Sequence, residues 1–133
     1  MAKIYFKGKN VQKNIEKGIS YYISAAFNES FTAQIFLGDI SYLGKHVKQD
    51  IEIAIHFYNL AADQNEPRSL YNLGFIYDEG VYVSRDFRKA FYYYSLAAKL
   101  NNANAQFCLG LLYFKGTFVT SDINKAIHYF ILS

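Results

Sequence analysis

The chain of 133 residues is poor in residues that cross-link or interrupt a fold: it has one cysteine, one proline and no tryptophan. The single cysteine, Cys108, excludes an internal disulfide, so nothing in the chain requires an oxidising compartment. The scarcity of proline leaves long segments free to form helices. Apolar stretches are interrupted well before the length of about 18 residues that a membrane span needs. We therefore predict a domain whose composition suits an all-helical fold and that does not insert into a membrane.

The sequence also lacks the motifs that carry common chemistry. It contains no HExxH, CxxC, P-loop or GxGxxG pattern. Cys108 has no sequence partner that would activate it as a nucleophile. We therefore predict no catalytic residue, no metal site and no cofactor. Lysines near the N-terminus interrupt any signal-peptide core, which favours a cytoplasmic location.

Charge is scarce and unevenly distributed. The net charge is +3, and five of the lysines precede residue 20. Such a basic end fits either a solvated helix face or an acidic partner. Nucleic acid binding needs a larger basic footprint, so no nucleic acid partner is predicted.

The most specific feature of the sequence is a repeat of 36 residues. Self-similarity at such a period indicates stacked helical units that bury a continuous core. The landmarks in register are glycines (Gly8, Gly44, Gly80, Gly116; Gly38, Gly74, Gly110), leucines (Leu37, Leu73, Leu109), alanines (Ala54, Ala90, Ala126) and aromatic residues (Tyr22, Tyr58, Tyr94, Phe130).

Residues 67–102 show how one repeat is built: their pattern predicts an antiparallel pair of helices. Pro67 suits the first turn of the first helix, and Gly80 suits a left-handed residue that ends it. Asp86 is a natural N-cap for the second helix. Asn101 and Asn102 then turn the chain into the next repeat.

Gly74 lies inside the first helix, where glycine costs about 1 kcal/mol relative to alanine. The same cost recurs at Gly38 and Gly110, so we infer a close helix–helix contact at these positions. A neighbouring helix would approach the backbone there, and the paired alanines of the second helix would permit the same close approach.

The residues of this repeat resemble the Sel-1-like repeat family, a relative of the tetratricopeptide repeats. The matching positions in the third unit are Ser69, Leu73, Gly74, Tyr77, Gly80, Val83, Asp86, Ala90, Tyr93, Tyr94, Ala97 and Ala98. The resemblance implies a right-handed α/α superhelix (solenoid) of about three and a half helix hairpins. It also implies an adaptor for protein complexes. Ser41 and Gly18 depart from the pattern and predict looser packing near the N-terminus.

The register divides a single domain, 1–133, into four parts: a partial repeat 1–30, full repeats 31–66 and 67–102, and a truncated repeat 103–133. Either the chain is an excerpt of a longer array, or it is a short protein whose ends pack on something. In the final helix, Ile127, Phe130 and Ile131 have little to cover them. End-to-end self-association is therefore expected as a risk.

In tetratricopeptide-like stacks the first helices of the repeats line the concave surface, and this predicts a partner-binding face. The alternative is that several of its rings only pack between adjacent first helices. The candidate residues are Ile35, Phe36, Asp39, Tyr42, Arg68, Tyr71, Asn72, Phe75, Asp78, Asn104, Phe107, Leu111, Phe114 and Lys115.

These observations predict a non-catalytic scaffold that presents an aromatic groove to a protein or peptide. A structural spacer or a self-associating segment of a longer solenoid is the alternative. A one-to-one inhibitor of a specific protein is a third reading.

Overall fold

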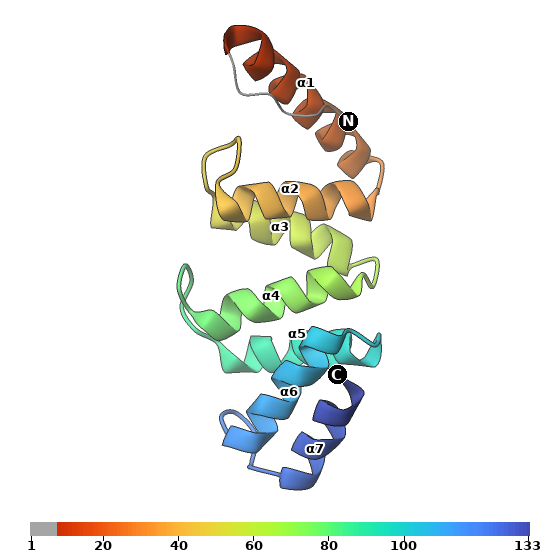
Figure 1. Ribbon diagram of the computed structural model, residues 1–133, viewed down its shortest axis with the longest axis vertical. Coiled ribbons are helices and arrows are strands. Elements are labelled where there is room, and N and C mark those ends of the chain that lie inside the picture. Colours follow the sequence, from red (N-terminus) through yellow and green to blue (C-terminus); the bar gives the residue numbers. More distant parts are fainter. Residues whose placement is uncertain (1–7) are drawn as a thin grey trace. The chain divides into compact units, whose positions relative to one another are not determined.

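The computed structural model describes residues 8–133, and within them every regular element is an α-helix. The all-helical prediction is therefore confirmed, and the helices follow one another as consecutive hairpins (Figure 1). Their bounds are α1 (Gly8–Phe27), α2 (Phe31–Leu43), α3 (Ile51–Ala62), α4 (Pro67–Glu79), α5 (Phe87–Lys99), α6 (Ala103–Lys115) and α7 (Ile123–Leu132).

Three hairpins, α2–α3, α4–α5 and α6–α7, share the same helix-ending chemistry. Their first helices end at Gly44, Gly80 and Gly116, whose φ angles of 71°, 62° and 65° are left-handed. Their second helices begin after Asp50, Asp86 and Asp122. In each case the aspartate carboxylate accepts a hydrogen bond from the backbone N–H three residues later. The predicted helix ends are confirmed.

The loop inside each hairpin is also built the same way three times. The N–H of the capping aspartate donates to the carbonyl of Ser41, Tyr77 or Tyr113 at 2.9–3.0 Å. One residue earlier, a side chain donates to a carbonyl of the preceding helix: Gln49 to Tyr42, Arg85 to Asp78, and Ser121 to Phe114. Carbonyls that a helix end leaves unpaired are thereby satisfied.

Connections between repeats use a left-handed residue that is not glycine. Glu29, Asn65 and Asn101 occupy the same repeat position and have φ angles of 65°, 58° and 64°. Asn102 then caps α6 by accepting a hydrogen bond from the N–H of Ala105. The predicted turn at Asn101 and Asn102 is confirmed.

Helix α1 differs from the other second helices. Gly8 shares the register of the helix-ending glycines, but it lies in α1, whereas the equivalents of residues 8–14 form loops in later repeats. The segment carries lysine, glutamine and asparagine and no proline, so it can extend the helix. The remnant of a first helix that the register predicts before Gly8 lies outside the described residues.

Packing divides the chain into two compact units, one ending at Gln64 and one beginning at Asn65. In the first unit, α1, α2 and α3 enclose a buried cluster that includes Ala26, Leu37 and Ile40. In the second unit, α4–α7 bury Tyr94 among other side chains. The organisation as a single domain stays a prediction.

Glycines inside the first helices lie directly against an aromatic ring of the same hairpin. A Cβ atom at Gly38 would lie 2.5 Å from the ring of Tyr58, and a Cβ atom at Gly110 would lie 2.5 Å from the ring of Phe130. The predicted close contact is confirmed. The expectation that little covers Phe130 is wrong, because its ring packs over Gly110.

Two buried glutamines connect consecutive helices within each unit. Gln34 Nε2 donates to the carbonyl of Ala26 at 3.0 Å, and Gln106 Nε2 donates to the carbonyl of Ala98 at 3.3 Å. Both occupy the same repeat position, where the repeat between them has Leu70. These bonds join the end of one hairpin to the start of the next.

Open space surrounds Gly18, where no atom lies within 4 Å of a Cβ position. This agrees with the looser packing expected there. In the later repeats, tyrosines take the place of Ser41, and they stack on Tyr93 and Tyr129 at 6.2 Å and 5.8 Å. Among the described residues, no helix is long and apolar enough to cross a membrane.

Candidate peptide-binding face

The predicted partner-binding residues fall on α2 in the first unit and on α4 and α6 in the second. On α2, Ile35 is only 5% exposed and belongs to the core, so it cannot contact a partner in this conformation. Phe36 is half-buried and stacks on Tyr22 with ring centroids 4.0 Å apart. Asp39 accepts a hydrogen bond from the hydroxyl of Tyr58 at 2.6 Å. Tyr42 is half-buried.

On α4 the predicted residues form a half-buried row. The Tyr71 ring lies 6.1 Å from the ring of Phe75 and 5.9 Å from the ring of Tyr94. Tyr71 therefore packs within the hairpin while keeping part of its surface open. Asn72 and Asp78 are also half-buried. Arg68 is exposed and forms an ion pair with Glu66 at 3.1 Å.

On α6 the predicted residues are more open. Phe107 is 49% exposed and Phe114 is 56% exposed. Phe107 contacts Phe130 with ring centroids 5.6 Å apart. Asn104 and Lys115 are exposed, and Leu111 is half-buried. The second unit therefore carries most of the accessible rings of this face.

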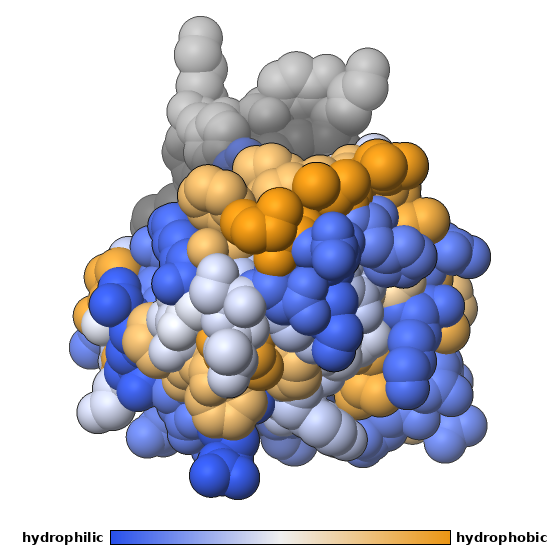
Figure 2. Space-filling view, turned by 90° about the horizontal axis from the view of Figure 1, so that it is seen from below, coloured by the Kyte–Doolittle hydropathy of each residue, from blue (hydrophilic) through white to orange (hydrophobic). Residues whose placement is uncertain are grey.

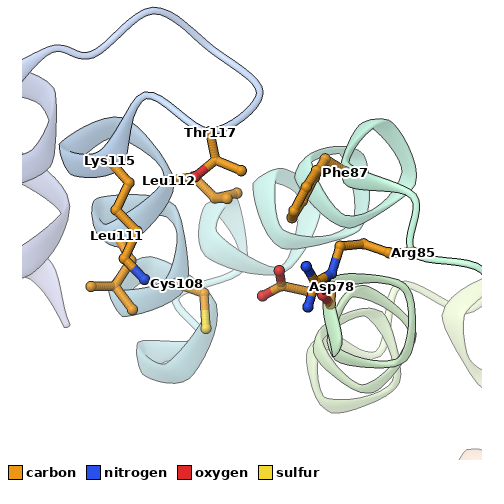
Figure 3. Close-up of a pocket in the computed structure, with 8 residues that line it drawn as sticks. All are labelled: Asp78, Arg85, Phe87, Cys108, Leu111, Leu112, Lys115 and Thr117. Atoms are coloured by element: carbon orange, nitrogen blue, oxygen red, sulfur yellow. Dashed lines mark hydrogen bonds between the residues drawn. The ribbon is translucent and has the colours of Figure 1, made fainter. Parts of the chain in front are cut away.

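A pocket of about 290 Å³ opens between α4 and α6. Figure 3 shows α6 side chains on one side and Asp78, Arg85 and Phe87 on the other. Three predicted residues, Asp78, Leu111 and Lys115, meet here. The complete lining is Asp78, Arg85, Phe87, Cys108, Leu111, Leu112, Lys115 and Thr117.

The pocket combines a polar rim with apolar side chains on its wall. Arg85, Lys115 and Thr117 are exposed, whereas Phe87 and Leu111 are at least half-buried. Arg85 is already engaged, since its Nε donates to the carbonyl of Asp78 at 2.8 Å and its guanidinium lies 5.3 Å from the ring centroid of Phe87.

Asp78 provides the negative charge of the pocket. Its carboxylate accepts a hydrogen bond from the hydroxyl of Tyr94 at 3.0 Å. Burial raises the pKa of Tyr94, and nearby Cys108 and Asp78 raise it further. Burial likewise raises the pKa of the Cys108 thiol, which reduces its thiolate fraction near neutral pH. The pKa of Tyr71 is raised by burial first and then by Cys108 and Asp78.

Sequence reasoning missed Arg85, Phe87 and Thr117, which come from the loops and from the start of α5. A signal was available for Arg85: it shares its repeat position with Gln49 and Ser121, and all three side chains donate to carbonyls of the preceding helix. In the part of the chain that the structure describes, no group of three histidine, cysteine, aspartate or glutamate residues is arranged to hold a metal ion.

The last helix, α7, exposes a separate apolar stripe. Ile123, Ile127 and Ile131 follow one another at four-residue spacing and are 52%, 49% and 76% exposed. In the equivalent helix α5, Phe91 stands at the position of Ile127, and it packs against Tyr113 and Phe118. Figure 2, which is turned from Figure 1 so that the structure is seen from below, shows a strip of hydrophobic side chains on the visible face.

Helix hairpins that repeat every 36 residues, with the same helix-ending glycines and capping aspartates, define the chain as an α-solenoid repeat protein. Within this class, the model of the Sel1 repeat family matches residues 1–26, 32–66, 67–102 and 103–133. The chain therefore belongs to the Sel1 repeat family, whose members are generally protein-interaction scaffolds.

Solved structures of Sel1-type proteins resemble this chain. A Sel1 repeat protein from Oxalobacter formigenes has 30% identity and a TM-score of 0.80, over 89% of this chain and 48% of its own. Helicobacter pylori cysteine rich protein B has 26% identity and a TM-score of 0.69, over 95% of this chain and 90% of its own. A protective antigen of uropathogenic Escherichia coli strains, at 23% identity, shares the fold with a TM-score of 0.79 over 92% of this chain and 29% of its own.

The chain thus spans about half the length of the Oxalobacter protein and less than a third of the Escherichia coli antigen. No curated protein is similar enough to this chain to be counted as a relative.

Proposed function

We propose that the second unit binds a peptide or a protein segment across α4 and α6, as a non-catalytic scaffold. The observation that carries the proposal is the accessible set of rings on these helices, beside the pocket that contains Asp78. Partly open aromatic side chains supply large contact areas at a low cost in side-chain entropy, and they dominate binding energy in many interfaces.

Rigidity of the framework supports this proposal. The rings of Tyr94 and Phe130 pack against Gly74 and Gly110. These contacts hold α4 against α5 and α6 against α7. Loop side chains bond to the last turns of α4 and α6, and aspartate caps fix the starts of α5 and α7. A face held in this way loses little freedom on binding, which favours affinity.

Phe114 offers the cleanest test of the face, because it is 56% exposed. We would select peptides from a displayed random library on the wild-type protein and measure their binding to Phe114→Ser. We expect this variant to weaken binding about tenfold or more, as loss of an aromatic anchor does. The matched control is Tyr92→Ser, which removes a 59%-exposed ring from α5. Equal loss in both variants, or no loss in Phe114→Ser, would contradict the proposal.

A double variant, Tyr71→Ala/Phe75→Ala, tests the α4 half of the face. Both rings also pack within the hairpin, so the helical circular dichroism of the variant must first match that of the wild type. Loss of the selected peptides by a folded double variant would extend the site to α4.

The α7 stripe favours a second candidate function, self-association or a spacer role in a longer solenoid. Ile127 and Ile131 are exposed, and they would be covered if a further helix packed on α7 in the way that α6 packs on α5. Sedimentation at increasing protein concentration tests this. We expect the mass to rise for the wild type and to stay monomeric for Ile127→Ser/Ile131→Ser. A wild-type mass that stays monomeric at every concentration would remove this candidate.

A further inference from the structure

We propose that the pocket between α4 and α6 receives a basic side chain, arginine or lysine, of the bound partner, with Asp78 as its counter-ion. This inference rests on the proposed binding face and names the residue type that anchors there. Four features of the pocket carry it: a carboxylate that makes no ion pair, the fixed orientation of this carboxylate, the apolar side chains beside it, and the donors at the rim of the pocket.

The carboxylate of Asp78 makes no ion pair with any residue that the structure describes, although it lies in the same pocket as Arg85 and Lys115. Arg85 is held elsewhere, on the carbonyls of Asp78 and Glu79 at 2.8 Å and 3.2 Å. Asp78 is half-buried, so its charge is screened less by water than a surface charge would be. An incoming cation would therefore gain more here than at an exposed carboxylate.

The hydroxyl of Tyr94 holds Asp78 in place. It donates to Oδ2 of Asp78 at 3.0 Å, and the Tyr94 side chain is fully buried. In Figure 3 the carboxylate oxygens of Asp78 point across the pocket toward α6. A carboxylate that is already oriented loses little freedom when it pairs with a ligand.

The walls match the rest of a basic side chain. Lysine and arginine carry apolar stems that pack along apolar surfaces while the charged head seeks a partner. Leu111, Leu112 and Phe87 supply such a surface beside Asp78. The volume of about 290 Å³ accommodates one long side chain.

The rim complements the peptide backbone. Lys115 and Thr117 are exposed at the mouth of the pocket, and neither side chain has a hydrogen bond or ion pair within the described part of the chain. Both can donate to backbone carbonyls of a partner whose side chain enters the pocket. An acidic side chain would pair with Lys115 instead of Asp78, so capped glutamate tests the opposite polarity.

Cys108 provides a direct reporter, because it lines the pocket and is the one cysteine in the chain. The experiment follows the rate at which N-ethylmaleimide alkylates Cys108 in the presence of N-acetyl-arginine methylamide. Capped norleucine and capped glutamate serve as comparison ligands of similar length. We expect capped arginine to slow alkylation with an apparent Kd about tenfold below that of capped norleucine, and added salt to weaken the protection.

Two carboxylate variants make the test specific. Asp78→Asn retains an oxygen that can accept from Tyr94, and we expect it to remove the advantage of capped arginine. Asp39→Asn is the matched control, since Asp39 also accepts from a buried tyrosine hydroxyl but does not line the pocket. We expect it to leave the protection unchanged.

Three results would overturn the inference: stronger protection by capped glutamate, equal protection by capped norleucine, or no protection by any of the three. This experiment needs no natural partner, so its failure is distinguishable from failure of the proposed function. If Phe114→Ser no longer binds the selected peptides while capped arginine gives no protection, the proposed binding face is supported and the proposed preference for a basic side chain is contradicted.

Discussion

The ring of Tyr94 occupies the space that a side chain on Gly74 would need: a Cβ atom at Gly74 would lie 2.7 Å from Cδ1 of Tyr94. Tyr94 is fully buried and cannot move aside easily. Glycine is therefore required in the middle of α4 by the packing of Tyr94, and the stability gained from this packing exceeds the cost of glycine in a helix.

Replacement of Gly74 by alanine tests this contact. Overpacking a core costs about 1–3 kcal/mol, whereas alanine returns about 1 kcal/mol of helix propensity. The clash is with a rigid ring, so we expect Gly74→Ala to lower the free energy of unfolding by about 1–2 kcal/mol.

Gly18→Ala is the matched control for Gly74→Ala. Gly18 also lies inside a helix, but nothing surrounds it within 4 Å. We expect this variant to gain about 0.5–1 kcal/mol. Urea denaturation of both variants measures the difference, and an unfolding midpoint for Gly74→Ala at or above that of the wild type would refute the packing argument.

Glu29 is predicted to be a strained connection residue. It has a φ of 65°, at a position where the later repeats place Asn65 and Asn101. Asparagine tolerates this left-handed conformation better than glutamate. We expect Glu29→Asn to raise the free energy of unfolding by about 0.5–1 kcal/mol and Asn101→Glu to lower it by a similar amount. Thermal unfolding of the two variants should show opposite shifts in Tm.

We predict that the buried hydroxyl of Ser69 lowers the free energy of unfolding. Its hydroxyl is fully buried and has no hydrogen-bond partner among the described residues. The equivalent residues of the neighbouring repeats are Ala33 and Ala105. A buried hydroxyl without a partner costs about 1–3 kcal/mol, so Ser69→Ala should be more stable than the wild type. Ala105→Ser is the reverse change and should be less stable; a destabilised Ser69→Ala would show that the hydroxyl has a role.

Stability at high pH should depend on the buried tyrosines. Burial and the adjacent carboxylates raise the pKa of Tyr58 and Tyr94 above the ordinary value of 10.0. The unfolded chain therefore loses these protons first, and stability falls as the pH rises above about 10, by about 1.4 kcal/mol per pH unit for each tyrosine that stays protonated in the fold. Below that pH the contribution is constant.

The double variant Tyr58→Phe/Tyr94→Phe isolates this effect. Phenylalanine is tolerated at the same repeat position, as Phe130 shows. We expect the variant to lose the hydrogen bonds to Asp39 and Asp78, and its stability to fall less steeply between pH 10 and 11. Chemical denaturation across this range measures the slope, and an unchanged slope would refute the assignment.

The predicted binding face shows how far its exposure can be predicted from the sequence. Period and register place Ile35, Tyr71 and Phe107 at one position of the first helices. Their exposure rises along the chain, from a buried Ile35 through a half-buried Tyr71 to a 49%-exposed Phe107. Register alone does not reveal this difference, because exposure depends on which neighbouring helix covers each residue.

The pocket likewise combines residues that no single pattern connects. Asp78, Leu111 and Lys115 were predicted from the first helices, but Arg85, Phe87 and Thr117 enter from loops and from the start of α5. The charge state of the pocket depends on pairing, and pairing depends on geometry. Arg85 bonds to backbone carbonyls rather than to the Asp78 carboxylate.

The sequence by itself determined the repeat, the helix hairpins, their caps and their helix-ending glycines, because these follow from local backbone preferences and from periodic burial. Only the tertiary structure decided which rings stay open, that Tyr94 holds Asp78, and that Cys108 shares their pocket. Those relationships join residues from different helices, and they arise from packing between elements rather than from the conformation of any one of them.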